Sequence, residues 1–200
     1  MPDVLAFDTA TSFVSCCVWR DGVVLAERRS REVRAAQGVL LLVEELLEES
    51  GVLRKQLDAV GVGIGPGSFT GLRIGIATAR GLALGLGVPV GGMGTLDALL
   101  AGCPGATAVI DARRGEVFVA GPGREPGVVA PADLAAQLEP GAVLVGDGAV
   151  RHRETFWGAS IAPDESPQHA PSAAAIAGLA GSLEPVEARY LRRPDAEAVA

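Results

Sequence analysis

The pattern of apolar and polar positions predicts that the first 30 residues form a strand followed by a hairpin. The run VLAFD (4–8) is short and apolar, while FVSCCVWR (13–20) and VVLAERR (23–29) flank the pair Asp21-Gly22. Asp-Gly is favoured in two-residue hairpin turns, because both central positions adopt positive φ. The chain therefore opens with three strands.

From residue 35 the apolar positions change to helical spacing and then alternate between helix and strand. AAQGVLLLVEELLEES is predicted as a helix stopped by Gly51, because its glutamates lie outside the apolar stripe. The elements that follow are a strand in LDAVGVGIG (57–65), a helix in TGLRIGIATARGLALGLG (70–87), a strand in VPVGGM (88–93) and a short helix in TLDALLAG (95–102).

The same order of elements starts again at residue 106, without a visible sequence repeat. The expected elements are strands in ATAVID, GEVFVA and GVVA, a helix in PADLAAQL, a strand in AVLV, an irregular loop over 158–172 and an Ala-rich helix within 171–181. Two such units predict an α/β protein of duplicated, ribonuclease-H-like lobes. We place the boundary near GCPGA (102–106), which gives an N-terminal lobe over 1–104 and a C-terminal lobe over 105–200.

Composition and charge narrow the function classes. The hydrophobic fraction of 48% fits a globular protein, and the formal net charge of −7 gives no general attraction to nucleic acid or to anionic lipid. Asp3 and Asp8 stand where a signal peptide would be apolar, and the longest apolar run, 81–96, is too broken by glycine to span a bilayer. We therefore expect a cytoplasmic protein with no membrane association.

The three cysteines are predicted to be reduced thiols. Cys16 and Cys17 are neighbours in a predicted strand, so their side chains should point to opposite faces of the sheet, and Cys103 leaves the count odd. A redox or metal role is the alternative, and we favour the buried thiols.

The stretch GVGIGPGSFTGLRIGIATARGLA (61–83) raises the question of a phosphate-binding loop. A P-loop needs a lysine after its last glycine, and none is present; the dinucleotide pattern Gly-x-Gly-x-x-Gly also fails, because its third glycine would fall on Thr70. We favour a mechanical reading, in which Gly65-Pro66-Gly67 forms a tight turn and Ser68 caps the following helix. A phosphate cradle stays as the less favoured alternative.

Two predicted helices carry faces that could bind a partner. On the second helix Gly71, Gly75, Ala79 and Ala83 recur every four residues, which allows close approach either by the protein's own sheet or by a subunit. Helix 35–50 has an apolar arc wider than one sheet needs. The residues predicted for a partner interface are Val39, Leu40, Val43, Leu47, Gly71, Gly75 and Ala79.

Acidic residues follow three of the predicted strands. Asp8, Asp111 and Asp147 could line a cleft and orient Mg²⁺ or a phosphate-bound water, although each is more simply explained as a turn former. Arg113 and Arg114 lie at a predicted hairpin tip, as solvated charges or as contacts to an anionic partner. His152 and His169 lack metal-ligand spacing, so we assign both a structural or surface role.

Several motifs, taken in order, resemble one bacterial family. LAFDTAT, GIGPGSFTGLRIG, VPVGGMGTLDALL, IDARRGEV, VGDGA and the closing RYLR are similar to the TsaB (formerly YeaZ) family, over most of the chain and least well over 145–200. The resemblance implies the duplicated actin-like ATPase architecture. It also implies a role in forming N6-threonylcarbamoyladenosine at position 37 of tRNAs that read codons beginning with A.

The resemblance further implies that the chain is a non-catalytic subunit without a cofactor. Its partners would be a TsaD-like catalytic subunit and a TsaE-like ATPase, with tRNA reached through the complex and a homodimer formed when the chain is alone. The catalytic paralogue carries two metal-binding histidines four residues apart, where this chain has Thr95 and Leu99, and Gln37 stands where many relatives have histidine. Leucine cannot ligate a metal, so we expect no metal at this position.

An enzyme of the same fold is the competing class. A phosphotransferase would need phosphate-binding glycines after Asp8, where the chain has Thr9 and Ala10. A peptidase would need a nucleophile with a base in reach, and no Ser-His or Cys-His arrangement is evident. We therefore favour the hypothesis that the chain is an interaction protein rather than an enzyme.

Overall fold

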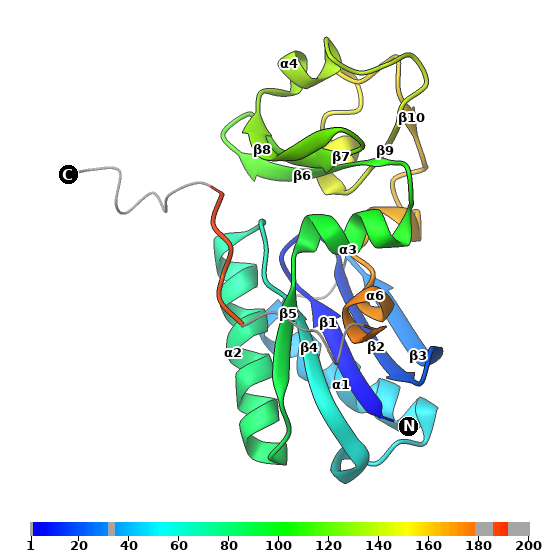
Figure 1. The fold of residues 1–200 in the computed structure, drawn as a ribbon, viewed down its shortest axis with the longest axis vertical. Helices are drawn as coiled ribbons and strands as arrows, with labels where there is room; N and C mark the ends of the chain where they lie inside the picture. Colours follow the sequence, from blue (N-terminus) through cyan, green and yellow to red (C-terminus); the bar gives the residue numbers. More distant parts are fainter. Residues whose placement is uncertain (1, 32–34, 179–185, 192–200) are drawn as a thin grey trace, which may run out of the picture.

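The protein is built on two five-stranded mixed sheets, stacked as two lobes in Figure 1. The structure is a computed structural model, which describes residues 2–31, 35–178 and 186–191. Within these residues no helix combines the length and the hydropathy needed to cross a bilayer.

The first sheet has the order β3-β2-β1-β4-β5. β1 pairs with β4, and β4 with β5, in parallel, whereas β2 pairs antiparallel with both β1 and β3. Its strands are β1 (Asp3–Asp8), β2 (Val14–Arg20), β3 (Val23–Ser30), β4 (Leu57–Gly63) and β5 (Val90–Met93). The predicted hairpin is confirmed, because Asp21 and Gly22 join β2 to β3 with φ values of 48° and 87°.

Helices cover both faces of this sheet. The helical segments of the lobe are α1 (Ala35–Ser50), the short 3₁₀ helix η1 (Arg54–Gln56), α2 (Phe69–Leu86), α3 (Thr95–Gly102) and α6 (Ala173–Gly178). α1 and α2 pack on the face that presents Leu5 and Phe7, and α6 packs on the face that presents Val4 and Ala6. Gly51 ends α1 and Gly87 ends α2, both with positive φ.

The neighbouring cysteines divide between these two faces, as predicted. Cys16 belongs to the core under α1 and α2, whereas Cys17 belongs to the core under α6. Both thiols are free and buried, and burial raises the pKa of Cys17 to about 12. Neither thiol is a ready nucleophile in the folded protein.

The second sheet repeats the topology of the first, with the order β10-β9-β6-β7-β8. The elements of this lobe are β6 (Thr107–Arg113), β7 (Glu116–Gly121), β8 (Arg124–Val129), α4 (Pro131–Ala135), β9 (Val143–Val145), α5 (Asp147–Arg151), β10 (Ser160–Ile161) and η2 (Pro167–His169). β6 and its hairpin partners match β1, β2 and β3, while β9 and β10 match β4 and β5. The duplicated α/β fold is therefore confirmed.

Two parts of the second lobe differ from the sequence prediction. VGDGA was expected to be a strand end and a turn, but Asp147 begins the short helix α5. The predicted loop over 158–172 contains the two-residue strand β10 and the 3₁₀ helix η2. The elements α5, β10 and η2 are too short to give a periodic signal in the sequence, and tertiary contacts determine them.

Helix α3 lies between the two sheets (Figure 1) and contributes to both. Leu96 and Leu99 pack with the β6 residues Ala108 and Ile110. Ala98, on another side of the same helix, packs with α6 under the first sheet. The lobe boundary near residue 104 stays a prediction, and α6, which follows that boundary in the chain, packs on the first sheet.

Candidate functional site

The glycine-rich turn between β4 and α2 wraps around the chain's own residues 8–10. A Cβ atom added at Gly67 would overlap the backbone of Ala10, and one added at Gly71 or Gly75 would overlap Thr9. The Ser68 N–H donates to the Ala10 carbonyl at 2.6 Å, and the Thr9 hydroxyl donates to the Gly71 carbonyl at 2.8 Å. The glycines therefore make room for a neighbouring loop of the protein.

This geometry decides between the two readings of the glycine-rich stretch. The space beside Gly67 and Gly71 is filled by protein, so it is not a free phosphate cradle. The Ser68 side chain accepts a hydrogen bond from the Gly71 N–H at 3.3 Å, which confirms the predicted cap. The stretch is a tight turn that starts α2.

The small-residue face of α2 is buried within the protein in this structure. Gly71 and Gly75 are buried against Thr9, and Ala79 is buried in the core under α1 and α2. The close approach that these residues allow is made by the protein's own sheet and by the loop that follows β1. In this conformation a partner cannot reach them.

Asp8 is fully buried at the end of β1. One carboxylate oxygen accepts from the Ala10 N–H at 2.7 Å and the other from the Thr95 hydroxyl at 2.8 Å. The absence of a side chain at Gly63 provides the space for this carboxylate. Burial raises the pKa of Asp8 to about 6, although both hydrogen bonds act in the opposite direction.

Asp147 lies where the two lobes meet. Its Oδ2 accepts from the Ser12 N–H of the first lobe at 2.8 Å, and its Oδ1 accepts from the Asp111 N–H of the second lobe at 3.1 Å. Burial raises the pKa of Asp147, and the two N–H donors oppose that rise. The carboxylate thus holds the turn after β1 against β6.

The Asp111 side chain is also paired with nearby residues of the protein. Its carboxylate forms ion pairs with Arg113 at 3.2 Å and with Arg151 at 3.5 Å. The structure therefore places Asp8, Asp111 and Asp147 along the junction of the lobes, where their hydrogen-bond partners come from the protein itself. Among the described residues no three His, Cys, Asp or Glu side chains form a metal-binding group.

The positions implied for the paralogue's histidine pair are closed. Besides donating to Asp8, the Thr95 hydroxyl accepts from the Gly65 N–H at 3.1 Å. Leu99 is buried in the core between α3 and β6. Gln37, the third position of this prediction, has a side chain outside the described residues. Both side chains are buried, Thr95 is hydrogen-bonded within the protein, and Leu99 has no ligating atom.

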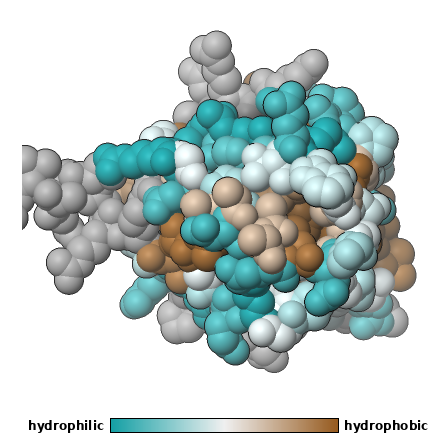
Figure 2. Space-filling model, turned by 90° about the horizontal axis from the view of Figure 1, so that it is seen from above, coloured by the Kyte–Doolittle hydropathy of each residue, from teal (hydrophilic) through white to brown (hydrophobic). Residues whose placement is uncertain are grey.

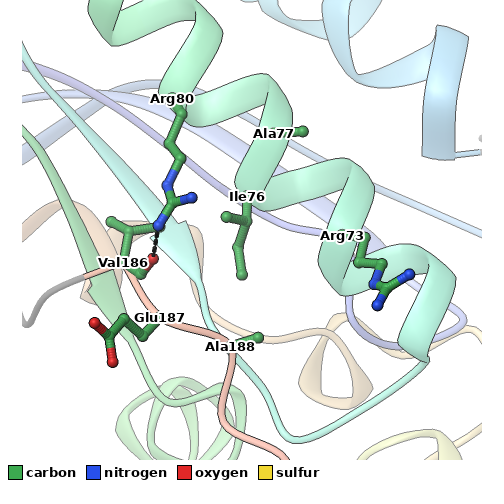
Figure 3. Close-up of a pocket in the computed structure, with 7 residues that line it drawn as sticks. All are labelled: Arg73, Ile76, Ala77, Arg80, Val186, Glu187 and Ala188. Atoms are coloured by element: carbon green, nitrogen blue, oxygen red, sulfur yellow. Dashed lines mark hydrogen bonds between the residues drawn. The ribbon is translucent and has the colours of Figure 1, made fainter. Parts of the chain in front are cut away.

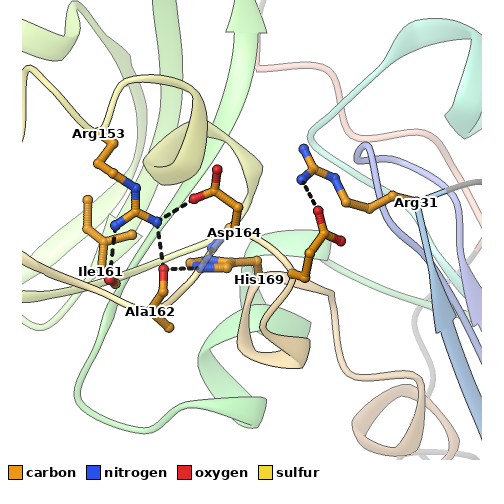
Figure 4. A network of polar contacts seen from close by, with 8 residues as sticks. Arg31, Arg153, Ile161, Ala162, Asp164 and His169 are labelled. Carbon is orange, nitrogen blue, oxygen red and sulfur yellow. Dashed lines mark hydrogen bonds and ion pairs between the residues drawn. The ribbon is translucent and has the colours of Figure 1, made fainter.

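His169 has the structural role that the sequence predicted, and Figure 4 shows its surroundings. Its Nδ1 accepts from the Gly146 N–H at 3.2 Å, and its Nε2 lies 3.2 Å from the Ala162 carbonyl. Since the first contact requires an acceptor and the second a donor, the buried ring is a neutral imidazole with the proton on Nε2. It joins β9 to the segment before α6.

Part of the exposed apolar surface of the first lobe lies on α1 and α2. Of the residues predicted for a partner interface, Val39 is fully buried, and Val43 and Leu47 are largely buried but line the groove described below. Leu40 is 46% exposed, and two leucines missed by the sequence analysis are more exposed: Leu41 at 60% and Leu84 at 86%. The uninterrupted run of three leucines at 40–42 was the available signal, because a single stripe cannot bury all three.

Between these helices runs an apolar groove of about 200 Å³. It is lined by Leu5, Leu40, Val43, Glu44, Leu47, Arg54, Leu57, Leu82 and Leu86. We call this groove, together with the exposed α1 leucines Leu40 and Leu41, the α1–α2 surface. Its rim carries both charges, since Arg54 pairs with Glu44 at 2.5 Å.

The segment 186–191 is held against the other side of α2, as Figure 3 shows. Arg80 donates to the Val186 carbonyl at 2.6 Å, and Val186 packs into the core of the first lobe. The Arg73 guanidinium lies 3.8 Å from the centre of the Phe69 ring. The centres of the Phe69 and Tyr190 rings are 5.6 Å apart. Residues 189–191, the described part of the RYLR motif, thus belong to a segment that returns to the first lobe.

Comparison with known proteins supports one family. The family model for TsaD, tRNA N6-adenosine threonylcarbamoyltransferase, matches residues 32–127. The tRNA threonylcarbamoyladenosine biosynthesis protein TsaB of Escherichia coli is 44% identical over 121 residues, which cover 58% of this chain and 52% of that protein. The uncharacterized protein Rv3421c of Mycobacterium tuberculosis is 41% identical over 202 residues, covering 98% of this chain and 95% of that protein.

Solved structures agree with the sequence comparison. A Pseudomonas aeruginosa protein described as similar to the peptidase YeaZ has a TM-score of 0.74 and 30% identity, covering 96% of this chain and all of that one. Component A of the Acidaminococcus fermentans (R)-2-hydroxyglutaryl-CoA dehydratase, at a TM-score of 0.54 and 12% identity, shares the fold alone. From its motifs, its duplicated topology and these relatives, the chain belongs to the TsaB (YeaZ) family.

Proposed function

We propose that this chain is a non-catalytic subunit of the cytoplasmic complex that forms N6-threonylcarbamoyladenosine at position 37 of tRNAs reading codons that begin with A. Family membership supports the reaction, because curated relatives from Escherichia coli and Bacillus subtilis are named tRNA threonylcarbamoyladenosine biosynthesis proteins. The non-catalytic role rests on the residues of this chain.

The observation that carries this role is the contact between Thr95 and Asp8. Thr95 occupies the first position of the paralogue's histidine pair. Its buried hydroxyl donates to Asp8 and accepts from the Gly65 N–H. Leu99 fills the second position with an apolar side chain. The histidine pair that would bind the metal is absent here, so the transfer chemistry belongs to a TsaD-like catalytic subunit.

The α1–α2 surface supports the binding of that subunit. Leu40 and Leu41 are large apolar side chains exposed to water beside the groove, and exposed apolar patches mark interaction sites. We propose that a TsaD-like subunit covers this surface in the complex and that a second copy covers it when the chain is alone. A TsaE-like ATPase and the tRNA join through the assembled complex.

The test is reconstitution with the catalytic subunit. Leu40→Asp with Leu41→Asp should weaken association at least about tenfold, because each change places a charge in an apolar contact. Val23→Asp is the matched control, since Val23 is an exposed valine on the edge strand β3 that does not line the groove. Unchanged association of the folded double variant would place the interface elsewhere.

The lone chain should have no activity of its own. We expect no tRNA modification when it is supplied with threonylcarbamoyl-adenylate, and no stoichiometric Zn²⁺ or Fe²⁺. The alternative is an ATP-dependent phosphotransferase or a peptidase of the same fold. Calorimetry with ATP and Mg²⁺ separates the two, because tight binding with turnover would overturn the non-catalytic role.

A further inference from the structure

A second apolar groove lies in the C-terminal lobe, away from the α1–α2 surface. It has a volume of about 260 Å³ and is lined by Ala135, Leu138, Glu139, Pro140, Thr155, Phe156, Trp157, Gly158 and Ala159. We call it the Trp157 groove. Figure 2, which looks down on this lobe, shows apolar surface in the middle of this end of the molecule, bordered by hydrophilic surface.

Trp157 is the most conspicuous side chain of the groove. It is 90% exposed, although tryptophan has more apolar area to hide than any other residue type. The adjacent Phe156 is buried in the core of the lobe, so the backbone at this position is fixed while the indole is left in water. Exposed tryptophans beside an apolar pocket are typical centres of protein interfaces.

The charges around the groove are acidic. Glu139 lines it and Glu154 directly precedes the lining residue Thr155; both are exposed, and no described cation pairs with either. The neighbouring arginines interact with other residues. Arg153 is held by Ala162 and Asp164, as Figure 4 shows, Arg151 pairs with Asp111, and Arg124 donates to Gln137.

These features select the chemistry of the occupant. An anionic lipid surface or an RNA backbone would be repelled by Glu139 and Glu154, and a second copy would bring the same net charge of −7. A segment with apolar side chains beside lysine or arginine would fill the groove, stack a cation on the indole and pair with both carboxylates.

We propose that the Trp157 groove is a docking site for a basic, apolar segment of a partner protein, distinct from the subunit bound at the α1–α2 surface. The chain would then bind one partner at the α1–α2 surface of the first lobe and a second partner at the Trp157 groove of the C-terminal lobe. Because the two surfaces lie on different sheets, both partners can bind at once.

The test is selection of peptides on the full chain. A phage-displayed library of random dodecapeptides is selected on the wild-type protein and depleted on the Trp157→Ala variant. Peptides rich in leucine or aromatic residues together with lysine or arginine should be enriched. Acidic peptides, or no enrichment at all, would overturn the proposal.

The affinity of one enriched synthetic peptide then identifies the contacts. Trp157→Ala should weaken binding at least about tenfold, and Glu139→Gln with Glu154→Gln should weaken it several-fold at low salt but little at high salt. The matched controls are Val23→Ala and Glu45→Gln with Glu48→Gln, which remove an exposed valine and two exposed glutamates from the other lobe. Equal losses in the controls would show that the peptide binds elsewhere.

Fluorescence provides a direct readout of the groove. The chain has two tryptophans, so Trp19→Phe leaves Trp157 as the only indole. Its emission should shift to shorter wavelength when the peptide binds, because the indole leaves water. Trp157-dependent dimerisation in sedimentation, or Trp157-dependent binding to anionic vesicles or RNA, would replace the proposed partner with a different occupant and overturn the proposal.

Discussion

The Oδ2 atom of Asp147 in the second lobe accepts a hydrogen bond from the backbone N–H of Ser12 in the first lobe, at 2.8 Å. The other oxygen of the same carboxylate accepts from the Asp111 N–H at 3.1 Å. One side chain therefore satisfies a backbone donor from each sheet's first hairpin region. Together with the hydrogen bond from Arg29 to the Pro167 carbonyl at 2.7 Å, this link connects the two halves of the duplicated fold.

Removing this link should loosen the junction of the lobes. Asp147→Ala leaves two partly buried N–H groups without an acceptor, which should lower the free energy of unfolding by about 2–4 kcal/mol. Asp147→Asn keeps one acceptor oxygen and should lose less. Urea denaturation measures both values. Hydrogen exchange should accelerate at the Ser12 and Asp111 amides, and unchanged exchange there would show that other contacts hold the lobes.

Ionisation of Asp8 should oppose folding above pH 4. Its pKa rises from 3.8 to about 6 on folding, so between these values the folded state binds more protons than the unfolded state. The free energy of unfolding should therefore fall as the pH rises through this window, by up to roughly 3 kcal/mol. Asp147 contributes in the same direction, because its pKa is also raised.

The Asp8→Asn variant isolates this contribution. Asparagine cannot ionise, so the difference in stability between wild type and variant should change between pH 4 and pH 6 and be constant above pH 7. Urea denaturation across this range is the measurement. A difference that is independent of pH would mean that Asp8 titrates normally in the folded protein.

Gly75→Leu should destabilise the first lobe itself. A side chain at this position would collide with Thr9, and overpacking of this kind costs about 1–3 kcal/mol or more. Gly81→Ala is the control within the same helix, because no atom lies within 4 Å of its added Cβ and alanine favours helix by about 1 kcal/mol. Thermal unfolding should shift in opposite directions for the two variants, and equal shifts would contradict the packing described.

Only one thiol should react rapidly in the native protein. Cys103 is partly exposed, whereas Cys16 and Cys17 are buried and burial raises the pKa of both. An aromatic disulfide reagent should titrate one thiol at neutral pH and three in denaturant. Two or three fast thiols in the folded state would show that the first sheet opens readily.

The strands and helices of the fold could be predicted because their patterns are long. The hairpin at Asp21-Gly22, the cap at Ser68 and the stop at Gly51 are local signals, and each lies where the sequence placed it. The repeat of element order was enough to predict the duplicated sheets.

The candidate sites were harder to predict, because burial depends on which faces meet. The Gly71 and Gly75 spacing indicates close approach but not what approaches, and the answer is the loop after β1 at Thr9. Similarly, the wide apolar arc of α1 does not distinguish the buried Val43 from the exposed Leu41. Sequence periodicity gives the faces of a helix, while the neighbours of each face are a property of the tertiary structure.

The placement of α3 between the two sheets has a consequence for how the protein unfolds. Its leucines Leu96 and Leu99 complete the core of the second sheet, Ala98 completes a core of the first, and Thr95 holds Asp8. A helix shared in this way cannot unfold with one half alone without leaving the other half a cavity. The two halves should therefore melt in a single cooperative transition, and neither should be a stable fragment when the chain is cut at residue 104.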